Sequence, residues 1–331
     1  MTQFPIARRT VIAGAGAGLA AQFLADKADA QAKPDVQASE YWAQKGDVKL
    51  ALYRKRAAPK AGEKQPVLFL VHGSSISAQP SFDLNVPGYS MMQAFAEWGF
   101  DVWTMDHENY GRSSRTSSNS DIRSGAADLQ AAAEVVARES GQTKVHYLGE
   151  SSGAIRAGLF AQLAPDRVDR LVLCAFTYKG TDSPEMARRA AVADKLRASN
   201  TRLRDGKMIR SIFTRDKLPG AYDVAVADAI WAVEQKYGDR VPTGTYLDMA
   251  VNLPLVDPKL VKSPVLMVRG DHDGNSTNED LLDFYAQLAN GDRQFVILPF
   301  TAHSLGFSKN RHLLWYAVRN FLAAPPAVPA A

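Results

Sequence analysis

The sequence predicts an α/β fold: a mostly parallel sheet of about eight strands, with helices on both faces and an inserted helical cap. Three observations support this fold class. Short apolar runs recur along the 331-residue chain, as expected of strands that are buried on both faces. Segments with helical spacing separate these runs, and strands that alternate with helices form mostly parallel sheets. From about residue 180 to residue 260 the spacing is helical, which interrupts the alternation.

Seven segments have the pattern of strands. Residues 48–53 alternate between polar and apolar side chains and predict an edge strand. The other segments are apolar runs, in chain order Val67–Val71, Asp101–Met105, Val145–Leu148, Leu171–Phe176, Val265–Gly270 and Phe295–Leu298.

Besides a helical segment at residues 154–159, four helices are expected outside the cap. Met91–Trp98 follows a long polar loop at residues 76–90. Asp121 can cap a helix that runs to Ser140 and stops at Gly141. The last two helices are expected around Glu279–Leu288 and over Arg311–Leu322.

These elements divide the chain into a core in two parts, residues 33–179 and 261–322, and a cap at residues 180–260. The Ala/Pro tail at residues 323–331 is expected to be flexible. Because the cap is inserted between two strands, we expect it to cover the carboxyl ends of the strands, where such sheets place their sites.

Residues 1–32 resemble an export signal. Arg8 and Arg9 precede an apolar run, Val11–Leu24, and Ala30-Gln31-Ala32 offers a cleavage site. The paired arginines are similar to a twin-arginine signal, which predicts an exported, periplasmic protein cleaved near Ala32. The alternative is an N-terminal extension with two chance arginines. The apolar run is too short to span a bilayer, and we expect no membrane anchor.

Composition excludes some function classes. Apolar residues make up 46% and charged residues 22% of the chain, as in soluble globular proteins, and the formal charge of +4 does not favour nucleic acid. The single cysteine, Cys174, lies in an apolar run and is expected to be buried. No residues have metal-ligand spacing, so we expect no metal and no cofactor. The sequence does not address the oligomeric state.

The pattern Gly149-Glu150-Ser151-Ser152-Gly153 follows one apolar run and precedes a helical segment. A serine at the apex of such a strand-turn-helix is exposed as a nucleophile, and glycine two residues away on either side avoids collisions. The alternative is an ordinary polar Gly/Ser turn.

A nucleophilic serine needs a base, a carboxylate and donors for an oxyanion. Of the six histidines, His303 follows the last strand by a short loop and is the predicted base. Two aspartates follow the preceding strand: Asp273 is favoured as the carboxylate, and Asp271, nearer the strand, is the alternative.

The oxyanion donors are expected to be two backbone N–H groups. That of Ser152 lies at the start of the helix after the predicted nucleophile. That of Ser74 follows His72-Gly73, where glycine lets the backbone approach closely.

Together these motifs resemble the α/β-hydrolase superfamily over about Val48 to Leu322. The resemblance rests on His72 to Ser75, Asp106 to Ser113, Gly149 to Gly153, Gly270 to Asp273, and His303. Two departures are Asn109, where many members carry glycine, and the absence of the Gly-rich oxyanion run of some lipases and esterases. The resemblance implies a serine hydrolase that cleaves a carboxylic ester or related acyl bond of a small molecule through an acyl-enzyme.

Other functions remain open on the same residues. The triad could serve carbon–carbon bond hydrolysis, acyl transfer or cofactor-free perhydrolysis, and a non-catalytic binding protein is a further alternative. The cap is basic between residues 188 and 217, which indicates either a solvated helix face or recognition of an anionic substrate. Its basic side chains are Arg188, Arg189, Lys195, Arg197, Arg202, Arg204, Lys207, Arg210, Arg215 and Lys217.

Overall fold

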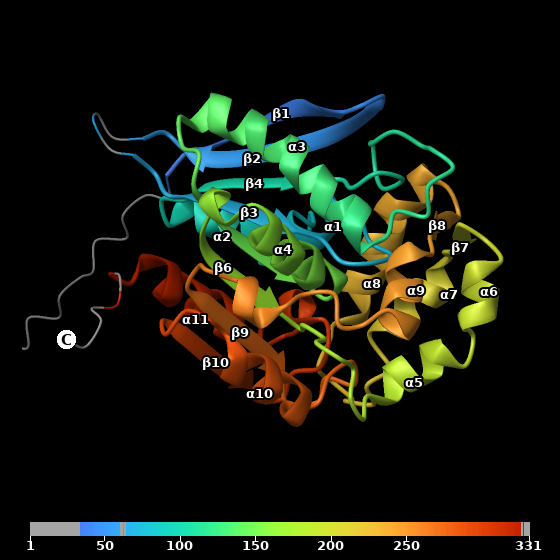
Figure 1. Cartoon of the computed structure of the whole chain (residues 1–331). Helices are drawn as coiled ribbons and strands as arrows, with labels where there is room; N and C mark the ends of the chain where they lie inside the picture. Colours follow the sequence, from blue (N-terminus) through green and yellow to red (C-terminus); the bar gives the residue numbers. More distant parts are fainter. Residues whose placement is uncertain (1–33, 60–61, 63, 326, 328–331) are drawn as a thin grey trace, which may run out of the picture. The chain divides into compact units, whose positions relative to one another are not determined.

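The computed structural model describes residues 34–59, 62, 64–325 and 327. The predicted export signal at residues 1–32 therefore lies outside the described residues. The fold is built on an eight-stranded sheet (Figure 1). Across the sheet the order is β1 (Val36–Lys45), β2 (Val48–Ala57), β4 (Asp101–Met105), β3 (Val67–Val71), β5 (Val145–Glu150), β6 (Val168–Cys174), β9 (Val265–Gly270) and β10 (Arg293–Leu298). All neighbours from β4 to β10 are parallel, which confirms the predicted fold class.

The prediction that residues 48–53 form the edge of the sheet is wrong. β1 pairs antiparallel with β2 over its whole length, from Val36 opposite Ala57 to Lys45 opposite Val48. The hairpin turns at Gly46, whose φ of +55° suits glycine. Most side chains of β1 are at least partly exposed, so this strand lacks the apolar pattern that identifies the others.

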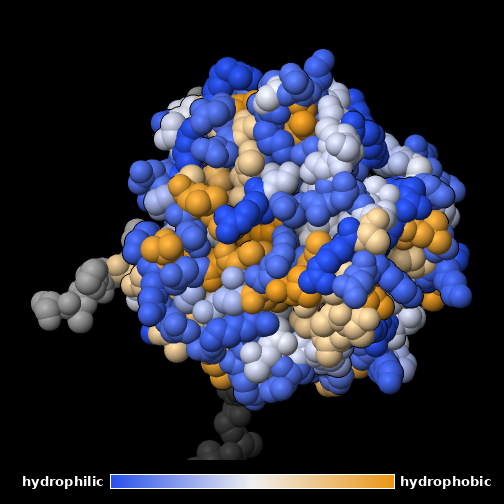
Figure 2. Space-filling view, turned by 45° about the vertical axis from the view of Figure 1, so that its right-hand side comes forward, coloured by the Kyte–Doolittle hydropathy of each residue, from blue (hydrophilic) through white to orange (hydrophobic). Residues whose placement is uncertain are grey.

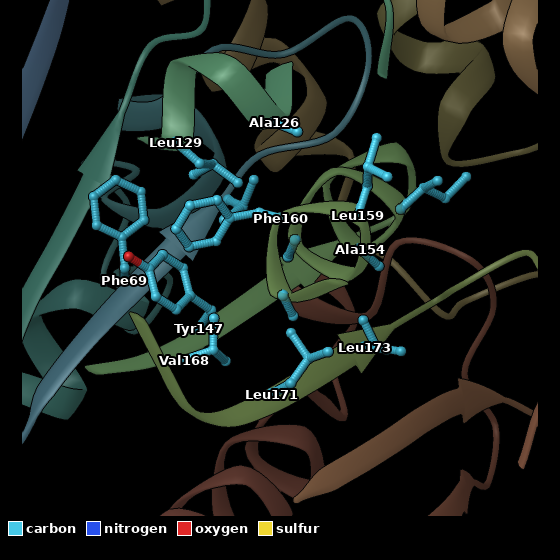
Figure 3. Close-up of a cluster of buried hydrophobic side chains, with 14 of the residues drawn as sticks. Phe69, Ala126, Leu129, Tyr147, Ala154, Leu159, Phe160, Val168, Leu171 and Leu173 are labelled. Atoms are coloured by element: carbon cyan, nitrogen blue, oxygen red, sulfur yellow. The ribbon is translucent and has the colours of Figure 1, made fainter. Parts of the chain in front are cut away.

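Helices cover both faces of the sheet. One face is packed by α3 (Ile122–Ser140), α4 (Ser152–Leu163) and α10 (Asn278–Gln287), and the other by α2 (Met91–Glu97) and α11 (Arg311–Ala323). Figure 3 shows part of the first layer, where aromatic side chains of β3 and β5 meet α3 and α4. Each buried side chain of this size stabilises the fold by about 1.5–3 kcal/mol.

The helix ends follow the predicted signals. Asp121 accepts a hydrogen bond from the Ser124 N–H at 2.7 Å, and Gly141 ends α3 with φ +70°. A short helix, α1 (Ala78–Phe82), stands within the region expected to be a polar loop. 3-10 turns lie at Pro165–Arg167, Gln235–Tyr237, Pro258–Leu260 and Leu305–Phe307, the second of them continuing a helix that ends at Glu234.

Residues between β6 and β9 form an insertion, gathered at one end of the sheet (Figure 1). It contains α5 (Pro184–Ala190), α6 (Ala193–Arg197), α7 (Gly206–Ile212), α8 (Val224–Glu234) and α9 (Gly244–Val251). It also contains two antiparallel strands, β7 (Thr201–Leu203) and β8 (Arg240–Pro242), where only helices were expected. Three-residue strands are too short to show a period in sequence.

A third apolar cluster joins this insertion to the core. Ile209, Ile212 and Phe213 of the insertion pack with Ile76 and Phe307, which follow β3 and β10. Figure 2 views the molecule with the insertion turned toward the reader. On this face, hydrophobic side chains lie in groups between hydrophilic ones. Among the described residues, no helix combines the length and apolar character needed to cross a bilayer.

Candidate active site

Ser151 lies at a sharp turn between β5 and α4. Its φ of 60° and ψ of −126° are costly for a residue with a side chain, by about 1–3 kcal/mol. A Cβ on Gly149 would collide with the carbonyl of Gly153, and a Cβ on Gly153 with the carbonyl of Val71. The turn therefore requires glycine at both positions, as the sequence pattern indicates.

Three predicted side chains meet at this turn. Oγ of Ser151 lies 2.9 Å from Nε2 of His303, and Nδ1 of His303 lies 2.9 Å from Oδ1 of Asp273. The histidine and the aspartate are buried, at 3% exposure each. This arrangement can move a proton from the serine hydroxyl to the imidazole while the carboxylate holds the ring.

The structure brings Asp273, and not Asp271, to His303. Burial alone would raise the pKa of Asp273, but His303, the Asn275 N–H and Arg269 outweigh it and hold that pKa below its usual value. Asp271 instead accepts the N–H groups of Phe300 and Thr301 at 2.9 and 3.0 Å. Its carboxylate therefore shapes the loop that carries His303.

Asn275 is a site residue that the sequence analysis did not identify. Its N–H donates to Oδ1 of Asp273 at 2.8 Å, and its Nδ2 lies 3.2 Å from Nε2 of His303. The only sequence signal is its position in the loop after β9, two residues beyond Asp273.

The predicted oxyanion donors stand beside Ser151. Ser152 is the first residue of α4, so its amide is one of the four that a helix leaves without an intrahelical acceptor. Ser74 follows β3, and its Oγ lies 2.8 Å from Oγ of Ser152 and 2.6 Å from Oγ1 of Thr245 in α9. The insertion thus holds the loop that carries the Ser74 amide.

The insertion also holds the loop that carries His303. The His303 N–H donates to Asp216 at 3.0 Å, and the Ser304 N–H donates to the phenolic oxygen of Tyr222 at 3.1 Å. Neither residue was singled out from the sequence, because the side chain of each accepts from a backbone N–H, a contact that no motif reveals.

The remaining histidines are engaged elsewhere or lie apart. His72 Nε2 accepts the His107 N–H at 3.1 Å, and burial is the largest cause that lowers the pKa of both rings. His146 faces Asp169, and His272 pairs with Asp271. His312 lies on α11.

A cleft opens over Ser151 between the sheet and the insertion. The empty volume of the cleft is about 540 Å³, part of which is open to solvent. The volume in which the centre of a water molecule fits is only about 60 Å³. The walls are therefore close together, which suits a slender small molecule. The insertion contributes Arg189, Ile212, Arg215 and Tyr246 to these walls.

Of the ten basic side chains at residues 188–217, two line this cleft, Arg189 and Arg215. Others form ion pairs away from it: Arg197 with Asp194, and Arg210 with Asp228. Arg204 is buried against Glu234. Within the described residues, no group of three or more His, Cys, Asp or Glu side chains is arranged to hold a metal ion.

Comparison with known proteins gives a family. The family model for the alpha/beta hydrolase fold matches residues 66–310. A curated relative, lipase lipl-3 of Caenorhabditis elegans, is 32% identical over 118 residues, which cover 31% of this chain and 27% of the lipase. The match thus spans about a quarter of the lipase's length.

Solved structures share the fold. That of E-2-(acetamidomethylene)succinate hydrolase superimposes with a TM-score of 0.62 and 20% identity, covering 87% of this chain and 100% of that one. That of a thermophilic esterase from Thermogutta terrifontis, with malate bound, gives 0.60 and 18%, covering 86% and 98%. At these identities the likeness concerns the fold alone.

Proposed function

The chain belongs to the α/β-hydrolase family, and we propose that it is a serine hydrolase that cleaves a carboxylic ester or related acyl bond through an acyl-enzyme. The observation that carries this proposal is the hydrogen-bonded series from Ser151 through His303 to Asp273. The relative named as a lipase, a kind of ester hydrolase, agrees with it.

In the proposed reaction, Oγ of Ser151 attacks the acyl carbonyl carbon and gives its proton to Nε2 of His303. The Nδ1–H of the ring donates to Asp273, whose charge stabilises the imidazolium that forms. The backbone N–H groups of Ser152 and Ser74 donate to the developing oxyanion.

The tetrahedral intermediate then collapses to an acyl-enzyme. The His303 imidazolium protonates the leaving group as its bond to the acyl carbon breaks. A water molecule attacks the acyl-enzyme, gives a proton to His303, and releases the acid as Ser151 recovers its hydrogen. The low pKa of Asp273 keeps this carboxylate charged throughout.

A panel of 4-nitrophenyl esters of increasing chain length tests the proposal. The wild-type protein is expected to release 4-nitrophenolate, and Ser151→Ala is expected to lower kcat by about 10³-fold or more, because the nucleophile is removed. Ser39→Ala is the matched control, because it makes the same change on an exposed side chain of β1, outside the cleft. Turnover by Ser151→Ala at the wild-type rate would refute the proposal.

We also propose that the protein is exported. The support is in the sequence: Arg8-Arg9 before an apolar run, and the Ala30-Gln31-Ala32 site. Cell fractionation with N-terminal sequencing tests this. A periplasmic protein that begins at Lys33 is expected, and an uncleaved protein in the cytoplasm would contradict the proposal.

A further inference from the structure

Four arginines of the insertion gather beside the cleft that holds Ser151. Arg189 and Arg215 line the cleft itself. Arg188, Arg202 and again Arg215 line a second space that adjoins the cleft. We call them the arginine cluster: Arg188, Arg189, Arg202 and Arg215.

Few negative charges oppose the arginine cluster. Glu185 bonds to Arg188 at 2.7 and 2.8 Å and to Arg189 at 3.1 Å, and Asp216 lies at the rim of the cluster. Four guanidinium groups thus face two carboxylates. Arg188 is 63% exposed, whereas Arg189 and Arg215 are largely buried. Buried cations with too few counter-charges are costly, and an anion that binds beside Arg189 and Arg215 offsets that cost.

Arg215 is the member best placed to bind a ligand. Its nearest carboxylate oxygens, on Glu185 and Asp216, are 3.7 and 4.0 Å away, beyond hydrogen-bond distance. In the part of the chain that the structure describes, its buried Nε–H has no hydrogen-bond partner. Arg189, by contrast, is 2% exposed and already donates to Glu185 and to the sulfur of Met249.

The pKa of Tyr246 reflects the positive charge of the arginine cluster. Its ring lies 3.9 Å from the guanidinium carbon of Arg202 and 4.2 Å from that of Arg189. Burial alone would raise the pKa of Tyr246, but Arg202, Arg189 and Arg215 outweigh it and lower the pKa to about 7. The wall of the cleft therefore favours negative charge, part of which the Tyr246 phenolate itself supplies near neutral pH.

One acidic side chain also lines the cleft. Glu150 accepts the Gly306 N–H at 3.4 Å, and burial raises its pKa. Its carboxylate is the one acidic group in the described lining of the cleft, against the guanidinium groups of Arg189 and Arg215.

We propose that the substrate carries a carboxylate, which Arg215 binds with the help of Arg189 while the scissile carbonyl stands at Ser151. This inference rests on the proposed function. The planar fork of a guanidinium matches the two oxygens of a carboxylate.

Matched esters test the inference. On the acyl side, 4-nitrophenyl hemiglutarate is compared with its methyl ester; on the leaving-group side, 3-carboxyphenyl butyrate is compared with its methyl ester. Wild-type protein is expected to prefer the acid over the neutral ester by tenfold or more in kcat/KM in at least one pair. Equal values in both pairs would overturn the inference.

Substitutions test whether the preference for the acid over the neutral ester arises in the cleft. Arg215→Gln should reduce the ratio of the two kcat/KM values to near one, and Arg215→Lys should keep part of it. Arg210→Gln is the control, because this substitution removes the same charge from the insertion. The Arg210 side chain is 55% exposed and is paired with Asp228. An equal loss of preference in Arg210→Gln and Arg215→Gln would contradict a specific site.

A binding measurement separates this inference from the proposed function. Calorimetry on Ser151→Ala protein, with glutarate and with neutral dimethyl glutarate, needs no turnover. Binding of glutarate that Arg215→Gln weakens tenfold or more supports the carboxylate site, even if no ester is hydrolysed and the proposed function fails. Absence of glutarate binding, with ester hydrolysis intact, would overturn the site alone.

Discussion

Oγ of Ser151 lies 2.9 Å from Nε2 of His303, although 152 positions separate the two residues in the chain. Ser151 follows β5, and His303 follows β10 at the far side of the sheet from β1. Parallel strands deliver their carboxyl ends to one edge, so the sheet itself brings the two side chains together. The contact is therefore a property of the fold rather than of any local motif.

Asp273 and Asp271 should differ in their effect on catalysis. Asp273→Asn removes the charge that stabilises the His303 imidazolium and disturbs the ring tautomer, so kcat is expected to fall by about 10³- to 10⁴-fold. Steady-state kinetics on a 4-nitrophenyl ester measures this.

Asp271→Asn is the matched control for that variant. Its carboxylate accepts the Phe300 and Thr301 N–H groups, so stability should fall while kcat changes by less than about tenfold. A larger loss of kcat in Asp271→Asn than in Asp273→Asn would reverse the proposed roles.

The turn at Ser151 should not tolerate a larger residue at position 153. Gly153→Ala places a Cβ against the backbone carbonyls of Val71 and His72, and we expect a loss of about 3 kcal/mol in the free energy of unfolding. Urea denaturation measures it. Gly291→Ala is the control, since a Cβ there meets nothing within 4 Å, and a similar loss in both variants would disprove the steric argument.

The hydrogen bond between Thr245 and Ser74 should matter to catalysis. Thr245→Val keeps the shape of the side chain but removes one of the two side-chain hydrogen bonds of Ser74, whose loop carries a proposed oxyanion donor. We expect kcat to fall by about tenfold, less than the 10²–10³ of losing a donor outright. Thr245→Ser retains the hydroxyl and should keep most of the activity; indistinguishable kinetics in wild type and Thr245→Val would show that the loop needs no such support.

The ionisation of Glu185 should make the stability of the protein depend on pH. Burial alone would raise the pKa of Glu185, but Arg188, Arg189 and Arg215 outweigh it and lower the pKa from 4.5 to about 2. The folded state thus binds fewer protons than the unfolded state, so the stabilisation is complete above pH 4.5 and disappears as the pH falls toward 2.

Glu185→Gln should therefore destabilise the protein by up to about 3 kcal/mol at pH 7 and by much less near pH 2.5. Urea titrations at both pH values measure the difference. Asp194→Asn, which alters a fully exposed ion pair, should have little effect at either pH. A loss in Glu185→Gln that is the same at both pH values would rule out the charge as its cause.

Much of the core was predictable, because its strands are buried on both faces and its helix α3 carries explicit caps. Strand β1 was not, since its exposed side chains leave no apolar pattern. The same holds for β7 and β8, which are too short to show one.

The site residues likewise divide into those that the sequence could identify and those that it could not. Ser151 could be singled out because it stands in a motif that follows a strand, and His303 because it follows the last strand by a short loop. The sequence could rank Asp273 above Asp271 only by position, whereas the structure separates them by their partners. The basic stretch of the insertion could not be resolved into Arg189 and Arg215, which line the cleft, and Arg210, which does not, because that depends on how α5 and α7 fold over the sheet.

Labelling with a fluorophosphonate followed by peptide mass mapping tests the central claim most directly, because this reagent phosphonylates only an activated hydroxyl. The account predicts one adduct per chain, on Ser151, and none on Ser151→Ala protein. An unlabelled wild-type protein, or an adduct that maps to another residue, would contradict it.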